Sequence, residues 1–227
     1  MLSSPTVTLC GPQRLAPTIG AMVKDVGASA PVAVITAGWR ERETDDDELS
    51  AAVGLQTINL GLYRRWRTIA EADSAYFDLH RERQDLLRAL QRVYRVRLRH
   101  LMNAVRAVNA LTGDAALLEP EVRAAIDMIG ALDRHHLDRV KQVHVEFENR
   151  VKPGSHPVIA KQRDEVSELL EGVDTVLIAG GHVAVLLNRL RLLGLRPHLE
   201  KRHVIAWSAG AMAMTSHVLL FHDFPPW

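Results

Sequence analysis

A serine stands where a predicted strand turns into a predicted helix near the end of the sequence. Residues 206–211 read Ala-Trp-Ser-Ala-Gly-Ala, with Ser208 in third place. Apolar residues precede this segment and small residues follow it, which predicts a strand, a sharp turn and a helix. Small residues on both sides let such a turn raise a serine hydroxyl clear of the backbone, and N–H groups at a helix start can stabilise an oxyanion. Ser208 is therefore a candidate nucleophile, and the alternative is a serine that only caps the helix.

A second strand-to-helix junction precedes the first. Residues 174–179 (DTVLIA) form an apolar run typical of a buried strand, and residues 180–182 (Gly-Gly-His) follow it. Apolar residues at 183, 186, 187 and 190 then have helical spacing. Because such junctions meet at the carboxyl edge of a parallel sheet, an N–H of the glycine pair could join that of Ala209 in holding a negative charge. The alternative is an ordinary glycine-rich turn.

Together, the Gly-Gly turn, the LLNRL helix and the WSAGAM segment resemble the serine peptidase family of aspartyl dipeptidases and cyanophycinases. That family has a class I glutamine amidotransferase-like fold. The resemblance covers about 1–62 and 152–227 and is most specific over 172–214. It implies that Ser208 is the nucleophile and that the backbones of Gly181 and Ala209 form the oxyanion hole. It also implies a small peptide or an aspartate-linked amide as the substrate, with no metal and no organic cofactor.

The sequence departs from this family's pattern at several positions. Ala206 stands where the first glycine of the serine motif would be, and His182 replaces the usual asparagine. Glutamine amidotransferases themselves use a cysteine nucleophile. The only cysteine here, Cys10, ends the first predicted strand far from the serine in the sequence, so glutaminase chemistry is not expected.

The catalytic base is the most serious departure. A serine nucleophile needs a histidine within hydrogen-bond reach and an acid to orient that histidine. After Ser208 the sequence offers His217, His222 and Asp223, and neither histidine matches the family's catalytic position. Three explanations stay open: the sequence is a fragment of a chain that carries the histidine, His222 is the base, or the protein is an inactive relative that binds a ligand or acts in assembly. The fragment is the preferred interpretation.

Further residues are predicted to bind the substrate together with Gly180 and His182. Trp207 adjoins the candidate nucleophile, and Trp39 and Glu41 come just after a predicted strand, at its carboxyl end. A tryptophan and a carboxylate there could bind the amine or guanidinium group of a peptide.

Short apolar runs and helical periodicities alternate along most of the chain. The predicted strands are 7–10, 32–37, 57–60, 175–179, 204–206 and 218–221, and the predicted helices are 17–26, 46–53, 162–170 and 183–193. Such alternation predicts an α/β fold with a doubly wound parallel sheet, which the resemblance specifies as flavodoxin-like.

The stretch 63–151 breaks this alternation. Apolar residues recur there at helical spacing on both sides of a Thr-Gly-Asp turn at 112–114, and Pro120 suits the first turn of a helix. We expect a long helical hairpin inserted into a core formed by 1–62 and 152–227. Its apolar stripe must be buried against the parent domain or against another copy, and the second outcome is a homodimer.

Charged residues and histidines in this hairpin favour surface roles. Its first helix is rich in arginine, but acidic residues lie among and before the arginines, and no aromatic ladder accompanies them. A solvated or paired helix face is therefore favoured over nucleic-acid binding. His144 and Glu148 could share a metal ion, but two ligands do not make a tight site, so no metal centre is predicted.

Composition excludes several classes of protein. A formal net charge of +1 argues against a general affinity for nucleic acid or membranes. One cysteine allows no internal disulfide, and no stretch approaches the about 20 apolar residues of a membrane span. The first residues also lack the pattern of a signal peptide. We therefore expect a cytoplasmic protein.

Overall fold

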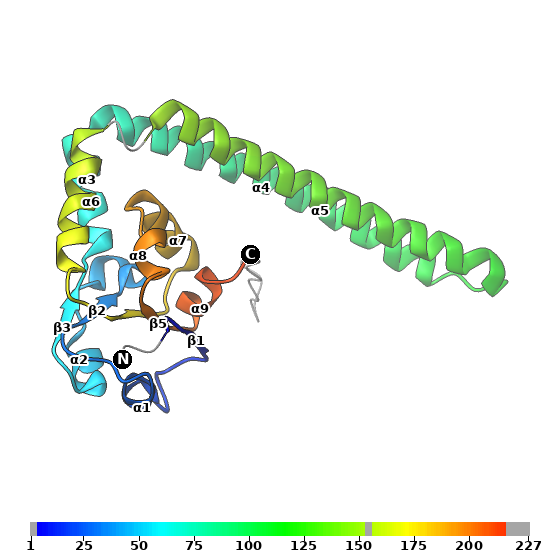
Figure 1. Cartoon of the computed structure of the whole chain (residues 1–227). Coiled ribbons are helices and arrows are strands. Elements are labelled where there is room, and N and C mark those ends of the chain that lie inside the picture. The colour runs from blue at the N-terminus through cyan, green and yellow to red at the C-terminus, as the bar shows by residue number, and fades with distance from the viewer. Residues whose placement is uncertain (1–3, 153–155, 217–227) are drawn as a thin grey trace. The chain divides into compact units, whose positions relative to one another are not determined.

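The computed structural model of the chain describes residues 4–152 and 156–216, which divide into two compact units. The sheet unit holds the described residues up to Ala72 and from 156 onward, and the helical unit spans Asp73–Lys152 (Figure 1). The predicted start of the hairpin at residue 63 is too early, because helix α3 (Leu62–Ala72) groups with the sheet.

The sheet unit is built on five parallel strands in the order β1-β5-β4-β2-β3. The strands are β1 (Val7–Cys10), β2 (Val32–Ile35), β3 (Thr57–Asn59), β4 (Thr175–Ile178) and β5 (His203–Trp207). They lie at the positions that the apolar runs predict, which confirms a parallel α/β fold. The predicted strand at 218–221 lies outside the described residues.

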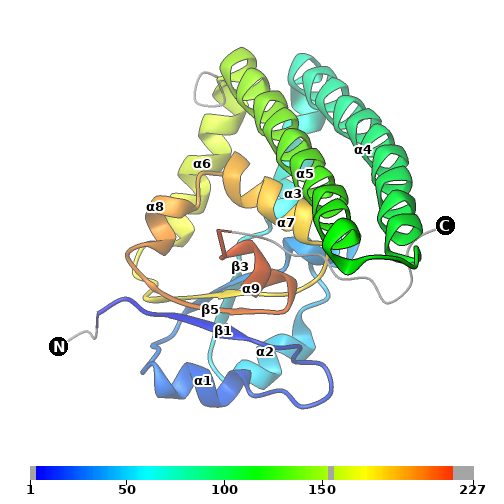
Figure 2. The ribbon, with the colours of Figure 1, turned by 90° about the vertical axis from the view of Figure 1, so that its right-hand side faces the viewer.

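Helices cover both faces of this sheet. They are α1 (Ile19–Asp25), α2 (Asp47–Val53), α3, α6 (Pro157–Leu169), α7 (Val183–Leu192), α8 (Arg196–Leu199) and α9 (Ala209–Ala213), with a 3-10 segment η1 (Ala37–Arg42). Helices α1 and α2 lie on one face, and α3, α6, α7 and α9 lie on the other (Figures 1 and 2). Helix α6 begins before the predicted residue 162 because Pro157 suits its first turn.

The central strands bury every residue, on both faces of the sheet, as parallel strands covered by helices on two faces do. On one face a core cluster joins α1 and α2 to the sheet, and it includes Val34, Leu177, Ile205 and Trp207. The intervening strand residues are also buried, against the opposite helices. The edge strand β1 differs, because its Val7 remains 57% exposed.

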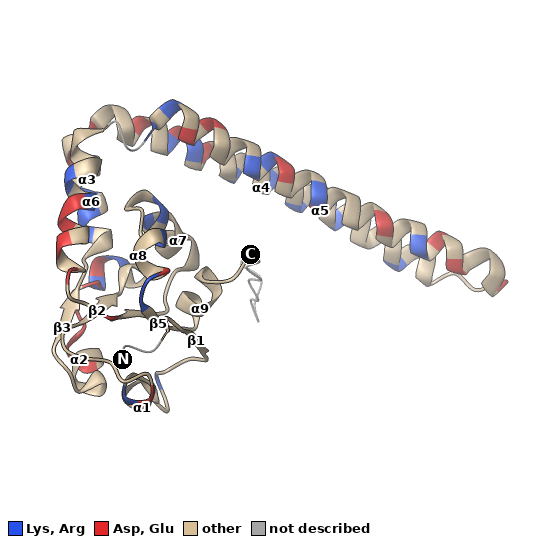
Figure 3. Cartoon of the chain, in the orientation of Figure 1, with Lys and Arg blue, Asp and Glu red and all other residues tan. Residues whose placement is uncertain are grey.

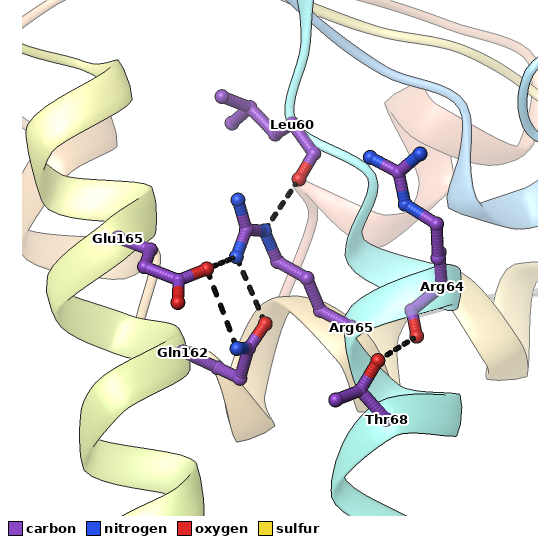
Figure 4. Close-up of polar contacts among 6 residues, drawn as sticks. All are labelled: Leu60, Arg64, Arg65, Thr68, Gln162 and Glu165. Atoms are coloured by element: carbon purple, nitrogen blue, oxygen red, sulfur yellow. Dashed lines mark hydrogen bonds and ion pairs between the residues drawn. The ribbon is translucent and has the colours of Figure 1, made fainter.

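An arginine fixes α3 against α6 and the end of β3 (Figure 4). Arg65 donates from Nε to the Leu60 carbonyl at 2.9 Å and from Nη1 to Gln162 Oε1 at 2.8 Å. The same guanidinium pairs with Glu165 and lowers the pKa of that carboxyl. Nearby, the Arg189 guanidinium of α7 lies 3.8 Å from the centre of the Trp66 ring of α3. Helix α3 is therefore held firmly beside the carboxyl edge of the sheet.

The helical unit is an antiparallel pair, α4 (Ser74–Asn109) and α5 (Ala115–Val151). Tyr94 of α4 stacks on His136 of α5 at 4.3 Å and donates its hydroxyl to Asp133 at 2.9 Å. Asp114 caps α5 through a bond from the Ala116 N–H, so the helix starts at Ala115. Pro120 consequently lies inside α5 rather than in its first turn. No helix among the described residues is long and apolar enough to span a membrane.

Candidate active site

The sheet order places a switch point between β2 and β4. The chain leaves β2 toward β3 and leaves β4 toward β5, on opposite sides of this pair. In parallel α/β sheets, ligands bind at the carboxyl ends of strands that part in this way. The turns after these two strands contain Gly38 and residues 180–182.

The backbones of these two turns are in direct contact. The His182 N–H donates to the Gly38 carbonyl at 2.8 Å. A Cβ on Gly38 would lie 2.5 Å from the Gly180 carbonyl oxygen, and one on Gly181 would overlap the Gly38 carbonyl. Gly181 also has a φ of +110°, which favours glycine. Glycines are therefore required on both sides of the contact, which fixes the Gly-Gly turn.

Ser208 occupies a strained turn between β5 and α9. Its φ of 52° and ψ of −121° lie in a region that residues other than glycine rarely adopt. Its N–H donates to the Cys10 carbonyl of β1 at 3.0 Å, and the residue is partly exposed. The side chain makes no capping hydrogen bond to α9, so the structure gives no support to the alternative of a simple helix cap. The predicted strand, turn and helix are all present.

The glycine turn after β4 lies against this serine. A Cβ built on Gly180 would be 3.3 Å from Ser208 Oγ and 3.6 Å from the Ala209 nitrogen. Within residues 4–152 and 156–216, the N–H groups of Gly181 and Ala209 donate no hydrogen bond to another group. The hydroxyl thus lies beside the Gly180 turn, and the N–H groups of Gly181 and Ala209 have no acceptor among the described residues.

A third glycine sets the position of α9. A Cβ on Gly210 would lie 2.8 Å from the Ala179 carbonyl oxygen and would overlap that of Ile178. The first turn of α9 therefore rests directly on the end of β4. This close approach brings the serine turn and the Gly-Gly turn together.

His182 caps helix α7 with its own ring. Nδ1 accepts a hydrogen bond from the Val185 N–H at 3.3 Å, and the residue is exposed. In the neutral imidazole the proton is then on Nε2, so that atom is a donor. His182 in this state suits a hydrogen bond to a substrate oxygen rather than the role of base.

The predicted substrate residues Trp207, Trp39 and Glu41 do not share one environment. The prediction for Trp207 is wrong, because this side chain is 7% exposed and packs in the core cluster toward α1 and α2. Trp39 is only partly buried and packs at the edge of the same cluster. Glu41 is exposed and accepts a hydrogen bond from the Tyr63 hydroxyl at 2.8 Å. The pKa of Glu41 is lowered, most by a hydrogen bond from its own backbone and next by the hydrogen bond from Tyr63.

Sequence reasoning missed the polar network that holds the segment after β2. Thr36 Oγ1 donates to the Glu43 carbonyl at 2.7 Å, and Asn59 Nδ2 donates to both of these oxygens at 2.9 Å. The segment also contains Arg40, whose φ of 59° and ψ of −119° nearly equal those of Ser208. A polar Asn59 at the end of an apolar strand was a visible signal for this network.

Glu43 is the buried carboxylate of this network, and it caps α3. Only 3% exposed, it accepts from the N–H groups of Tyr63 at 2.7 Å and Arg64 at 2.8 Å. Burial raises the pKa of Glu43, and these two hydrogen bonds offset only part of that rise. Nothing in the sequence marks it, because it lies in a run rich in charged residues.

Cys10 is close to the serine in space although distant in sequence. It is the register partner of Trp207, and its thiol lies 3.0 Å from Met22 Sδ. Burial raises the pKa of this thiol, which disfavours the nucleophilic thiolate.

The described residues contain no group of three or more metal-ligating side chains. His217, His222 and Asp223, the sequence candidates for a base and an acid, lie outside residues 4–152 and 156–216. Ser208 Oγ makes no hydrogen bond with any described residue.

Comparison of the chain with known protein families, curated proteins and solved structures finds no match.

Proposed function

We propose that the protein is a serine hydrolase that cleaves a small peptide or an aspartate-linked amide, in the manner of aspartyl dipeptidases and cyanophycinases. The observation that carries this proposal is the strained Ser208, with φ 52° and ψ −121°, beside the Gly180 turn at the carboxyl edge. Backbone strain of about 1–3 kcal/mol persists where the surrounding structure imposes it, and it clusters at functional sites.

The proposed reaction is acyl transfer to water. Ser208 Oγ attacks the amide carbonyl and gives its proton to a base, while the carbonyl oxygen takes up negative charge. The N–H groups of Gly181 and Ala209 stabilise that oxyanion. The carbon–nitrogen bond then breaks, the amine leaves with the proton, and water hydrolyses the acyl-enzyme to regenerate Ser208.

Exposed polar groups in the segments that follow β2 and β4 are our candidates for substrate binding. His182 offers its Nε2–H, and Glu41 offers a carboxylate held by Tyr63. Glu41 remains our candidate for the amine of a peptide, and Trp39 our candidate for an apolar wall. His222 is the proposed base within this sequence. No metal or organic cofactor takes part in the proposed reaction, which would take place in the cytoplasm.

The proposal also specifies the fold more closely. We assign the sheet unit to the flavodoxin-like arrangement of the class I glutamine amidotransferases. In this proposal α4 and α5 form an insertion between α3 and α6. The support is the parallel sheet order, with the serine turn and the Gly-Gly turn on neighbouring strands.

A fluorophosphonate probe tests the nucleophile in the complete product of the gene. The wild type should be labelled, and Ser208→Ala should lose the label while keeping its melting temperature. Ser29→Ala is the matched control and should be labelled like the wild type. The Ser29 hydroxyl is hydrogen-bonded to Asp174 and should not react with the probe. Mass spectrometry of the labelled peptide identifies the modified serine.

Absence of labelling in the folded wild type would contradict the proposal and favour an inactive relative. Labelling that persists in Ser208→Ala would also contradict it. Replacement of His222 by Gln separately tests the base: retained labelling at an unchanged rate would remove this histidine from the mechanism without affecting the assignment of the nucleophile.

A further inference from the structure

Large apolar side chains of the helical unit are exposed over most of its length. Between residues 81 and 131 no described residue is buried. The exposed apolar residues of the pair are Leu86, Val93, Val96, Met102, Leu117, Ile126, Met128, Leu137 and Val145. Soluble proteins rarely leave so many large apolar side chains in water unless another surface covers them.

The distribution of charge along the pair shows what that surface must offer. Five arginines of α4 fall within residues 88–99, and no acidic residue occurs between 86 and 113. Arg92, Arg95, Arg97 and Arg99 make no ion pair or hydrogen bond with any side chain in residues 4–152 and 156–216. These arginines are solvated in the single chain and available to a partner.

The α5 stretch beside these arginines does not neutralise them. Contacts of Tyr94 with Asp133 and His136 align residues 88–99 with about 130–141 of α5. The charged residues of that α5 stretch are Asp133, Arg134, Asp138, Arg139 and Lys141. The middle of the helix pair is therefore strongly positive.

The end of the pair near the connecting turn has the opposite sign. Its acidic residues are Asp114, Glu119, Glu121 and Asp127, against Arg106 and Arg123. Figure 3 shows the basic residues in the middle stretch and acidic residues toward this end. The helix pair thus carries a positive and a negative region at different positions along its axis.

We infer that a second copy of this chain covers the helix pair. The two pairs run antiparallel, so that the acidic turn end of each lies along the arginine-rich stretch of the other. A two-fold axis between them uses the same surface on both copies, as dimers of identical chains do. The result is a four-helix bundle. This inference does not rest on the proposed hydrolase activity.

The size of the overlap suits a stable dimer. In this dimer the centre of the acidic end of one copy lies beside the centre of the arginine stretch of the other. The two copies then overlap over about 27 residues of each helix, or about 40 Å at 1.5 Å per residue. Two adjacent helices present a width of about 20 Å. The product is about 800 Å² per partner, which is the usual size of a specific interface. The overlap would cover Val93, Val96, Met102 and Ile126, whereas Val145 lies beyond it.

Charge also selects this arrangement over a parallel one. A parallel pairing would set arginines against arginines over the whole middle stretch, and like charges in contact disfavour association. The antiparallel pairing leaves Arg92 and Arg95 near Glu119 and Glu121 of the other copy.

The first test measures the mass of the whole protein by size-exclusion chromatography with light scattering. The wild type should have twice the monomer mass at micromolar concentration. Val93→Glu with Leu137→Glu should have the monomer mass with unchanged helicity. Val145→Glu is the matched control, because Val145 is 47% exposed on the same helix pair but outside the overlap, and it should remain dimeric. A monomeric wild type, or a dimer in the double variant, would overturn the inference.

The second test exchanges charges. Arg92→Glu with Arg95→Glu places glutamates beside Glu119 and Glu121 of the other copy, and Glu119→Arg with Glu121→Arg places arginines beside Arg92 and Arg95. Each variant alone should be monomeric, and an equal mixture should recover the dimer mass. Failure of the mixture to recover would contradict the antiparallel arrangement.

Binding of nucleic acid is the competing outcome. The arginine stretch would then retain a fluorescent duplex DNA or a polyuridine strand at low salt, with a steep loss as salt rises. Retention by a monomeric wild type that Arg92→Glu with Arg95→Glu abolishes would replace the dimer inference. A dimer that does not retain either probe supports the inference.

Discussion

The carboxyl edge of the sheet and the helix pair are stabilised in different ways. At the edge, glycines 38, 180, 181 and 210 let backbones touch, and Ser208 beside them has a strained backbone conformation. In the helix pair, side chains between 81 and 131 are all at least partly exposed, and long helices are aligned by a few polar contacts. Substitutions should therefore have large, local effects at the edge and small, distributed effects in the helix pair.

The largest effect is expected for Gly210→Ala. The new Cβ would overlap the Ile178 carbonyl oxygen, which belongs to the rigid end of β4. We expect a loss of about 3 kcal/mol in the free energy of unfolding, which corresponds to a fall of about 6–12 °C in melting temperature. Gly11→Ala is the matched control, because a Cβ there meets nothing within 4 Å. Equal melting temperatures for the two variants would show that the edge is not tightly packed.

A somewhat smaller effect is expected for the buried carboxylate. Glu43→Ala leaves the N–H groups of Tyr63 and Arg64 without their acceptor, at a cost of about 2 kcal/mol. Glu43→Gln retains one acceptor oxygen and should cost about 1 kcal/mol. Urea denaturation measures both changes, and the exposed Glu168→Gln should change stability by less than about 0.5 kcal/mol.

The same residue predicts a pH dependence. Burial raises the pKa of Glu43 above its ordinary value of 4.5. Between 4.5 and that raised value, the folded protein holds more protons than the unfolded chain, so stability falls as the pH rises through this window. Glu43→Gln should remove this decline. An unchanged profile in the variant would assign the titration to another group.

Strain at the serine predicts a gain in stability. Ser208→Gly relieves a φ of 52°, whereas Ser208→Ala retains it. We expect the glycine variant to be about 1 kcal/mol more stable than the alanine variant, after the entropy cost of glycine is subtracted. Arg40→Gly should gain stability similarly, since Arg40 has nearly the same dihedral angles. Thermal melts of Arg40→Ala and Arg40→Gly provide the comparison, and a less stable glycine variant at either position would contradict this account of the strain.

Sequence patterns predicted the strands and the two turns well because both depend on local composition. Fully apolar runs mark strands buried on two faces, and glycines mark close backbone contacts. Trp207 was assigned wrongly, although strand alternation places it on the same face as Ile205, which is in the core. The grouping of α3 with the sheet, and the contact of Gly38 with the Gly-Gly turn, could not be predicted because both depend on chain segments far apart in sequence.

The smallest effect is expected in the helix pair, where Tyr94→Phe tests the polar layer. The substitution removes the bond to Asp133 but keeps the ring stacked on His136. Asp133 remains accessible to water, so the cost should be about 1 kcal/mol or less. Stability followed by far-UV circular dichroism checks this value, and a double-mutant cycle with Asp133→Ala should give a coupling energy of similar size. A loss above about 2 kcal/mol would show that this layer is as tightly constrained as the carboxyl edge, and would end the contrast between the two units.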